Sequence, residues 1–255
     1  MAAGFSWSAE LARVFGQVAD LYDRARPGYP AEAVGWLVRS TPHLILDLGA
    51  GTGKLTAALV AAGHRVVAVD PSPQMLAILR RTVPEAEALE GAAEAIPLPD
   101  AEVGAVVVAQ AFHWFDHPVA LDEIARVLQP HGQLGLVWNL RDVSTPWVAE
   151  LSGIIGNADA SRAEIAPAVR AARTHFTAFE TAQFKYAQRL DCETLLSLVR
   201  SRSYVAIRPA DEQDEICAKV TRLFDRFAGP DGLVLPYITH CYRGTRKPSP
   251  LDAMK

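Results

Sequence analysis

The chain has 255 residues, of which 50% are hydrophobic and 21% charged, a composition typical of globular proteins. This excludes an intrinsically disordered chain and leaves ample apolar surface for a core. The formal net charge of −4 argues against a general polyanion-binding surface, so we expect no nucleic-acid partner. The apolar runs over residues 55–62 and 103–109 are far shorter than the ~20 residues that span a bilayer, and the first ten residues do not look like a signal peptide. We therefore expect a cytoplasmic protein without a membrane partner.

The three cysteines are Cys192, Cys217 and Cys241. Their number is odd and none stands in a CxxC pair, so the sequence predicts free thiols rather than disulfides or a zinc site.

The first forty residues predict two helices. The first helix has apolar residues at helical spacing, and residues 26–30 end it with a turn rich in proline and glycine. Pro30 suits the first turn of a second helix. The apolar positions are Leu11, Val14, Phe15, Val18, Leu21 and Tyr22 in the first helix and Val34, Leu37 and Val38 in the second.

Strands then alternate with helices as far as residue 142. Such alternation predicts βαβ units, hence a parallel sheet with helices on both faces. The run over 103–109 is entirely apolar apart from a glycine, as expected for a strand buried on both sides. The expected strands are 43–48, 65–70, 86–90, 103–109 and 133–138, and the expected helices are 53–62, 73–81 and 118–128, with a turn at 129–132.

The last hundred residues mix helices with two further strands. Because Pro236 lies in the second of these strands, we expect that strand near a sheet edge or with a local break. The expected helices are 146–155, 192–202 and 211–227, and the expected strands are 179–186 and 233–242.

A glycine-rich turn at residues 49–53 follows the first strand and opens a helix. It is not a P-loop, since Leu48 and Leu55 replace the required glycine and hydroxyl, and Lys54 breaks the dinucleotide pattern GxGxxG. What remains is Asp47, a spacer, and three glycines alternating with other residues. Glycines there permit a tight turn and close approach of a ligand to the backbone.

Asp70 ends the second strand, 19 residues after Gly51. A carboxylate in this place can accept both hydroxyls of a ribose. The alternative is a helix cap, but Ser72 is the better cap candidate, which leaves Asp70 for a ligand.

Four spaced segments resemble the successive motifs of class I S-adenosylmethionine-dependent methyltransferases, and most closely the methyltransferase type 11 group. They are DLGAGTG at 47–53, VDPSPQML at 69–76, GAAEAIP at 91–97 and RVLQPHG at 126–132. The sequence His113-Trp114-Phe115 further resembles a trans-aconitate methyltransferase-like subgroup. The resemblance implies a Rossmann-like three-layer α/β sandwich, whose seven-stranded, mostly parallel sheet has an antiparallel last strand.

The resemblance also implies one domain over 1–255. Its parts are N-terminal helices over 1–40 that cover the cofactor, a cofactor-binding core over 41–142, a lid insert over 143–175, and C-terminal strands and helices over 176–245.

The cofactor implied is S-adenosyl-L-methionine. The glycine turn would lie along its methionine part, Asp70 would bind the ribose, and Met75 would pack on the adenine. Relatives often have an acidic residue where Ala92 stands here, so the adenine amino group would depend on Ala93 or Glu94. The cofactor-binding residues implied are Asp47, Gly49, Ala50, Gly51, Gly53, Asp70, Pro71, Met75, Ala93, Glu94, Gln110, Tyr22 and Arg26, the last pairing with the cofactor carboxylate or lying in solvent.

The acceptor pocket should lie beyond the carboxyl ends of the fourth and fifth strands. We expect His113, Trp114, Trp138 and Arg141 to bind the substrate there, with Arg141 facing an acidic acceptor or pairing with Asp142. His113 is the candidate general base, or else makes a structural hydrogen bond. His113 and His117 lack a third ligand, so we expect no metal.

Three further arginines, Arg200, Arg202 and Arg208, fit a solvated helix face. The sequence thus predicts an enzyme that methylates a small molecule, at a carboxylate or hydroxyl oxygen. The alternatives are a regulatory protein that binds S-adenosylmethionine without methyl transfer and, disfavoured by Lys54, a nicotinamide-dependent dehydrogenase.

Overall fold

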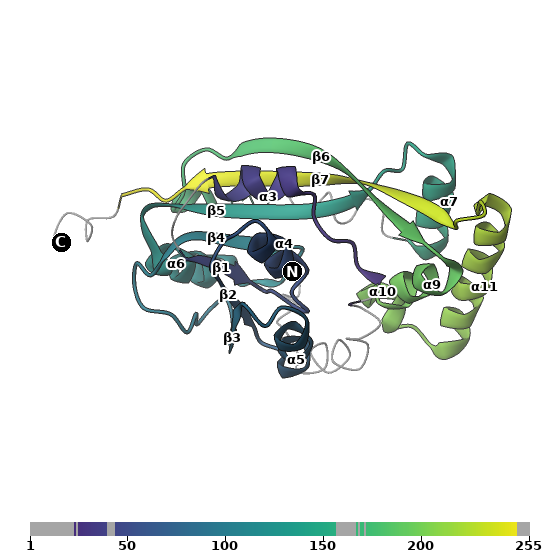
Figure 1. Cartoon of the computed structure of the whole chain (residues 1–255), viewed down its shortest axis with the longest axis horizontal. Coiled ribbons are helices and arrows are strands. Elements are labelled where there is room, and N and C mark those ends of the chain that lie inside the picture. Colours follow the sequence, from purple (N-terminus) through teal and green to yellow (C-terminus); the bar gives the residue numbers. More distant parts are fainter. Residues whose placement is uncertain are drawn as a thin grey trace, which may run out of the picture.

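The computed structural model describes residues 23, 25–39, 44–156, 167, 169–170 and 172–248. The helix expected at 11–22, including Tyr22, lies outside these residues. In the described part, a seven-stranded sheet has the order β3-β2-β1-β4-β5-β7-β6 (Figure 1). Its strands are β1 (Ile45–Leu48), β2 (Val66–Asp70), β3 (Glu87–Glu90), β4 (Val103–Ala109), β5 (Leu128–Arg141), β6 (Glu180–Leu190) and β7 (Leu233–Thr245).

The pairing confirms a Rossmann-like, mostly parallel sheet. Strands β1 to β5 are parallel, whereas β7 runs antiparallel to both of its neighbours, β5 and β6. Strand β1 lies between β2 and β4, so the strand order reverses beside it. In open sheets of this kind, ligands bind beyond the carboxyl ends of the strands at such a switch point.

Helices cover both faces of the sheet, because alternate residues of the buried strands point to opposite sides. On one face, α3 (Ala31–Val38) and α4 (Lys54–Ala61) pack with Ile45, Val107 and Val137, and α5 (Pro73–Thr82) packs against β2. On the other face, α6 (His117–Val127) packs against Leu46, Val106 and their neighbours. This is the three-layer arrangement that the sequence predicts.

The strand with Pro236 was expected near a sheet edge or with a local break, and β7 is indeed the strand next to the edge. Strand β7 lies inside the sheet, and β6 forms the edge. The pairing of β5 with β7 ends at Arg141 and Tyr237, one residue before it would reach Pro236. Pro236 is tolerated because it lies outside this pairing and owes β5 no N–H. Its carbonyl still accepts a hydrogen bond from the backbone N–H of Asp142.

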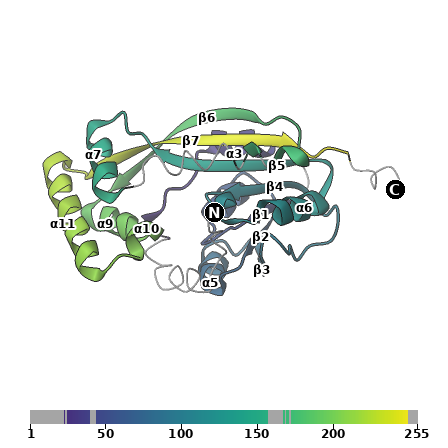
Figure 2. The same cartoon turned by 180° about the vertical axis from the view of Figure 1, so that it is seen from behind.

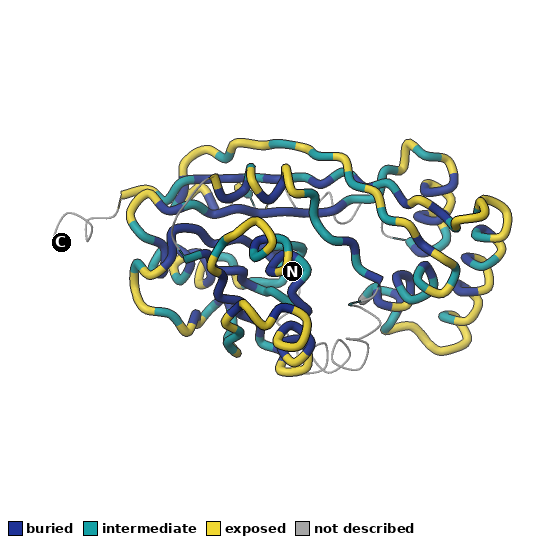
Figure 3. Tube along the Cα trace, viewed as in Figure 1, coloured by how far each residue is buried: buried dark blue, intermediate teal, exposed yellow. Residues whose placement is uncertain are grey.

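A second group of helices lies where β6 and β7 extend beyond β5 (Figures 1 and 2). It contains α7 (Pro146–Ile155), α9 (Cys192–Arg200), α10 (Ser203–Ala206) and α11 (Ala210–Phe227). These helices share a hydrophobic core with the ends of β6 and β7, while the outer side of α11 is largely exposed (Figure 3). We call this part the helical lobe. The helix expected at 192–202 ends at Arg200, and the short α10 follows it.

The RVLQPHG segment forms the start of β5 rather than a simple turn. Leu128 pairs with Val103, and regular pairing resumes only at Gln133 with Ala105. The residues between them form an irregularity, where His131 has a φ of 63°.

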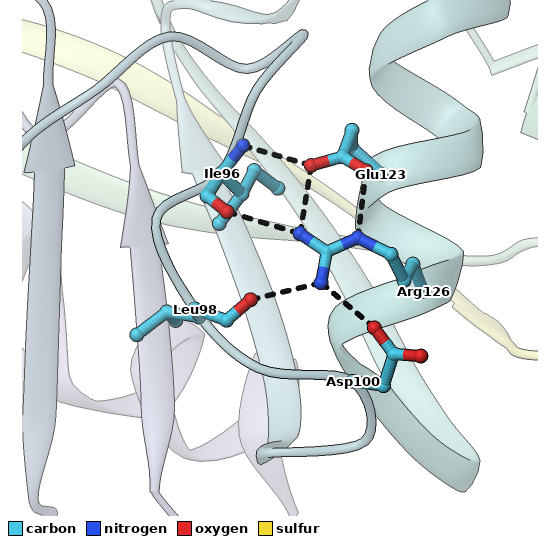
Figure 4. A network of polar contacts seen from close by, with 5 residues as sticks. All are labelled: Ile96, Leu98, Asp100, Glu123 and Arg126. Atoms are coloured by element: carbon cyan, nitrogen blue, oxygen red, sulfur yellow. Dashed lines mark hydrogen bonds and ion pairs between the residues drawn. The ribbon is translucent and has the colours of Figure 1, made fainter.

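Arg126 in the same segment fastens α6 to the loop before β4 (Figure 4). Its guanidinium donates to both carboxylate oxygens of Glu123, to the carbonyls of Ile96 and Leu98, and to Asp100, at 2.7–3.0 Å. These five bonds use every N–H of the side chain. The residue therefore has a structural role, which explains its place in the motif.

No helix among the described residues is long and apolar enough to cross a membrane.

Candidate active site

The glycine-rich turn between β1 and α4 requires its glycines. Gly49, Gly51 and Gly53 all have left-handed φ angles, of 71°, 56° and 89°. A Cβ at Gly49 would lie 2.7 Å from Cβ of Ala111, and one at Gly53 would lie 2.8 Å from Cγ of Leu79. At Gly51, by contrast, a Cβ would meet nothing within 4 Å. The outer two glycines thus permit packing, while the middle one leaves space for a ligand against the backbone.

Asp70 braces this turn from the end of β2, which corrects the expectation that its carboxylate is left for a ligand alone. Its Oδ2 accepts from the N–H of Gly51 at 2.8 Å, and its Oδ1 accepts from the N–H of Ser72 at 2.9 Å. Ser72 caps α5, as predicted, through its hydroxyl and the N–H of Met75. Burial raises the pKa of Asp70, although both backbone bonds oppose the shift. Each carboxylate oxygen keeps a second lone pair with which it can accept another hydrogen bond.

Asp47 is fully buried in β1. Its Oδ2 accepts from the Thr56 hydroxyl at 2.6 Å, while its Oδ1 has no hydrogen-bond partner among the described residues. Burial, and to a smaller extent the charge of Asp70, raise the pKa of Asp47 to about 7. Asp47 therefore acts first as a buried group that fixes the start of α4.

A cleft opens between the glycine turn, the ends of β4 and β5, and the helical lobe. About 540 Å³ of space in and above it is not filled by protein atoms, part of it open to solvent. Its lining residues are Arg26, Pro27, Tyr29, Gly49, Ala50, Gly51, Thr52, Lys54, Leu55, Ala109, Gln110, Asn139 and Arg202. The cleft therefore joins the expected cofactor side to the expected acceptor side.

Gln110 and Asn139 form the floor between these two sides. Gln110 has a φ of 57°, and its side chain donates to the backbone carbonyl of Asn139 at 3.2 Å. The side chain of Asn139 donates to the carbonyl of Gly28 at 2.9 Å and accepts from the Thr239 hydroxyl at 2.6 Å. These bonds hold the segment before α3 against the sheet. The sequence pointed to Gln110 but missed Asn139, whose only signal was its place at the end of a predicted strand.

The segment before α3 also contacts the glycine turn and the helical lobe. Lys54 pairs with Asp23 at 3.0 Å, and the guanidinium of Arg26 donates to the carbonyl of Ser201 at 2.9 Å. Arg26 lines the cleft, as expected for a residue near the cofactor, and so does Lys54, which the sequence suggested only as a departure from known patterns.

The residues expected around the adenine follow the carboxyl ends of β2 and β3 in the sequence. Met75 and Ala93 are both 5% exposed. Pro71 is half-buried beside Asp70. Glu94 accepts from the N–H of Asp116 at 2.8 Å and so holds the loop after β4. None of the four lines the cleft described above.

His113 lies in the short helix η1 (Phe112–Trp114), directly after β4. Its ring lies 4.7 Å from that of Trp114, and its Nδ1 is buried without a partner among the described residues. Burial, and then the nearby His117, lower the pKa of His113 to about 4, so the ring is neutral near pH 7. The described residues hold no cluster of three or more possible metal ligands. His113 follows the cleft-lining residue Gln110 closely in the sequence, but His113 does not itself line the cleft.

The other three residues expected to bind the acceptor do not line the cleft themselves. Trp138 is 2% exposed and packs edge-to-face with Tyr242 in the core, and half-buried Trp114 contacts His113. Arg141 is half-buried at the end of β5, where it donates to the Ser152 hydroxyl at 3.1 Å. It does not pair with Asp142, whose carboxylate accepts from Ser144 instead.

Comparison with known proteins shows the family of this chain. Residues 46–136 match the type 11 family model described as a methyltransferase domain. An uncharacterized methyltransferase of Mycobacterium tuberculosis is 45% identical over 240 residues, which cover 92% of this chain and 97% of the relative. The chain belongs to the class I S-adenosylmethionine-dependent methyltransferases.

Other methyltransferases extend the likeness. An uncharacterized methyltransferase-like protein of Schizosaccharomyces pombe is 36% identical over 248 residues, 91% of this chain and 94% of the relative. The solved structure of a putative type II methyltransferase from Anaeromyxobacter dehalogenans has a TM-score of 0.62 at 23% identity and covers 87% of this chain and 97% of that one. The cofactor of this methyltransferase is S-adenosylmethionine.

The site geometry fits that cofactor. The space at Gly51 admits a ligand to the backbone, and Asp70 presents a carboxylate at the end of β2. The cleft also contains a guanidinium, that of Arg26, which suits a cofactor with a carboxylate.

Proposed function

We propose that this methyltransferase methylates a small-molecule acceptor at an oxygen atom, of a carboxylate or a hydroxyl group. The observation that carries this proposal is the single cleft that the glycine turn shares with Gln110, Asn139 and Arg202. One space thus borders the cofactor motif and the ends of β4 and β5. A cleft of this kind, lined by both polar and apolar residues, suits a small-molecule acceptor.

On the cofactor side, we propose that Asp70 accepts the ribose hydroxyls with the lone pairs that Gly51 and Ser72 leave over. The turn at Gly49, Ala50, Gly51 and Gly53, with Asp47 behind it, would hold the methionine part. Pro71, Met75, Ala93 and Glu94 would surround the adenine, with Gln110 beside the reacting end. Tyr22 and Arg26, in the segment before α3, would cover the amino-acid end.

S-adenosylmethionine supplies a methyl group on a sulfonium, which an acceptor oxygen can take directly in line. The chain therefore needs no covalent nucleophile of its own; its task is to orient two reactants and to exclude water. Gln110 and Asn139 are fixed by hydrogen bonds and provide a rigid floor. The contacts of Asp23 with Lys54 and of Arg26 with Ser201 hold the segment before α3 against α4 and against the residues after α9.

His113 remains the candidate for a catalytic role. With a pKa lowered to about 4 it is neutral near pH 7, so it can accept a proton or a hydrogen bond but is a weak base. A carboxylate acceptor is already deprotonated near pH 7 and needs no base, whereas a hydroxyl acceptor does. The weak base thus favours the carboxylate within this proposal.

The trans-aconitate methyltransferase-like subgroup is the finer family that the His113-Trp114-Phe115 sequence supports, and it is part of the same proposal. So are a cytoplasmic location and the absence of a metal and of nucleic-acid or membrane partners. The alternative is a regulatory protein that binds S-adenosylmethionine without transferring its methyl group.

The test is a screen of acceptors grouped as carboxylic acids, alcohols and phenols, and amines, with methyl-¹³C-labelled cofactor. Release of S-adenosylhomocysteine together with an O-methyl carbon resonance in the product supports the proposal. An N- or C-methyl product contradicts the oxygen assignment. Tight binding of cofactor with no turnover in any group supports the regulatory alternative. The variant Asp70→Ala serves as the control for cofactor-dependent turnover.

A further inference from the structure

Three arginines from distant parts of the chain meet where β5 ends. Arg141 is the last residue of β5, Arg202 follows α9, and Arg26 precedes α3. All three lie close enough to the buried Tyr237 of β7 to act on its phenol electrostatically, and Arg202 acts on Arg141 in the same way. The cluster is therefore a concentration of positive charge beside a fully buried side chain.

This cluster is continuous with the cleft. Arg26 and Arg202 line the cleft directly. Asn139 also lines it, and Arg141 stands two residues further along β5, hence on the same face and about 7 Å away along the strand. A molecule in the cleft can therefore reach the cluster without leaving the site.

No described carboxylate forms an ion pair with Arg141 or Arg202. Arg141 has the neutral partners Ser152 and Tyr204. The Nε atom of Arg202 is buried and has no hydrogen-bond partner among the described residues. Burial and the neighbouring charge of Arg202 lower the pKa of Arg141, so the folded chain carries an electrostatic cost here.

Two other arginines that are not exposed, Arg126 and Arg243, do have carboxylate partners. Arg126 uses all five N–H groups on two carboxylates and two carbonyls (Figure 4). Arg243, which is 3% exposed, pairs with Glu180 at 2.6 Å. Arg141 and Arg202 differ from these two arginines, because no described carboxylate pairs with either.

We propose that Arg141 and Arg202 form a binding site for an anionic group of the methyl acceptor, a carboxylate or a similar oxyanion. Guanidinium groups bind such anions through paired, charge-assisted hydrogen bonds, and the incoming charge removes the cost of leaving the two cations together. This inference rests on the proposed function and narrows it: the acceptor is an organic anion held beside the sheet end, with its reacting atom toward Gly51 and Gln110.

The test measures anion binding to the protein loaded with S-adenosylhomocysteine, by isothermal titration calorimetry with citrate, succinate and inorganic phosphate as probes. The variants are Arg202→Gln and Arg141→Gln. Arg200→Gln is the matched control, because Arg200 lies in the last turn of α9 and is exposed. We expect at least one probe to bind the wild-type protein and the control, and about tenfold or greater weakening in each test variant.

Two further measurements separate this inference from other roles. S-adenosylhomocysteine should bind all variants about as well as wild type. Without anion, the test variants should unfold at the same or a higher temperature than wild type, because an uncompensated charge has been removed.

The inference is overturned if no probe distinguishes wild type from the test variants, or if either variant unfolds at a lower temperature. It is also overturned if the variants lose cofactor affinity and keep anion affinity, since the arginines would then bind the cofactor carboxylate. Failure of the proposed function looks different, because then no acceptor is methylated although cofactor and probes bind.

Discussion

Asp70→Asn separates the two tasks that the structure gives this carboxylate. The aspartate accepts from Gly51 at 2.8 Å and from Ser72 at 2.9 Å, one bond on each oxygen. Asparagine has a single acceptor oxygen, so one of the two backbone N–H groups would face an amide that also donates. An unsatisfied buried donor costs about 1–3 kcal/mol, so we expect the free energy of unfolding of the protein without ligand to fall by that amount.

The same change should weaken binding of the cofactor. Loss of the charge and of one acceptor for the ribose hydroxyls should reduce affinity for S-adenosylhomocysteine about tenfold, and Asp70→Ala should cost about 2–3 kcal/mol, or ~30- to 150-fold. Calorimetric titration measures affinity, and urea unfolding measures stability. Glu90→Gln is the matched control, because Glu90 ends β3 opposite Asp70 and is exposed. Unchanged affinity in a folded but destabilised Asp70→Ala protein would show that Asp70 braces the turn without binding the cofactor.

Three other residues give independent predictions. The pKa of Asp47 is about 7 in the fold and near 3.8 in its absence, so the folded chain keeps a proton that the unfolded chain loses. The free energy of unfolding should therefore fall as pH rises between these values, by up to about 4 kcal/mol. In Asp47→Asn, the free energy of unfolding measured with urea should depend less on pH, and equal pH dependence in both proteins would refute this. Arg126→Ala should lower the free energy of unfolding by about 2 kcal/mol, or roughly 4–8 °C in Tm, with Arg126→Lys in between, whereas equal loss in both would contradict a role for the planar fork. The His113 ring should titrate with a midpoint near 4, so its NMR shifts should stay constant from about pH 6 to 8; a midpoint near 6.5 would refute its burial without a partner.

Local patterns in the sequence were enough to predict the first half of the fold. Each strand from β1 to β4 is a short run bounded by glycines, prolines or charges, and β4 was predicted to the residue at Val103–Ala109. The start of helix α5 could be placed because Ser72 is its N-cap and the next residue, Pro73, is its first residue. These signals are local, so they survive without knowledge of the tertiary structure.

The errors concern features that depend on distant partners. Pro236 suggested a place near a sheet edge, but it did not reveal that β6 forms the edge itself or that β5 stops pairing with β7 one residue short of the proline. Trp138 was expected at the acceptor because it ends a strand, but its side chain points to the face that packs on Tyr242. Because β5 continues to Arg141, Trp138 is not at the end of its strand but lies inside the sheet, where its side chain is buried.

The candidate site likewise has a part that local sequence patterns reveal and a part that depends on distant partners. Its cofactor side is built from βα turns that are continuous in sequence, so the glycines and Asp70 were recognisable as a pattern. What the pattern did not reveal was the pair of backbone bonds to Asp70, which exist only once the turn at Gly51 folds back on β2. The sequence thus located the carboxylate but overestimated how much of it is available to a ligand.

The proposed acceptor side is assembled from Asn139 and Arg202, which come from separate parts of the chain and meet only in the fold. Arg202 looked like one of several arginines on a solvated surface, since nothing nearby in sequence marks its Nε as buried. Its environment depends on the helical lobe, which has a hydrophobic core separate from those on the two faces of the sheet. Substitutions in the lobe can therefore change the acceptor side without disturbing the turn that serves the cofactor, which is why acceptor identity is harder to derive from sequence than the cofactor.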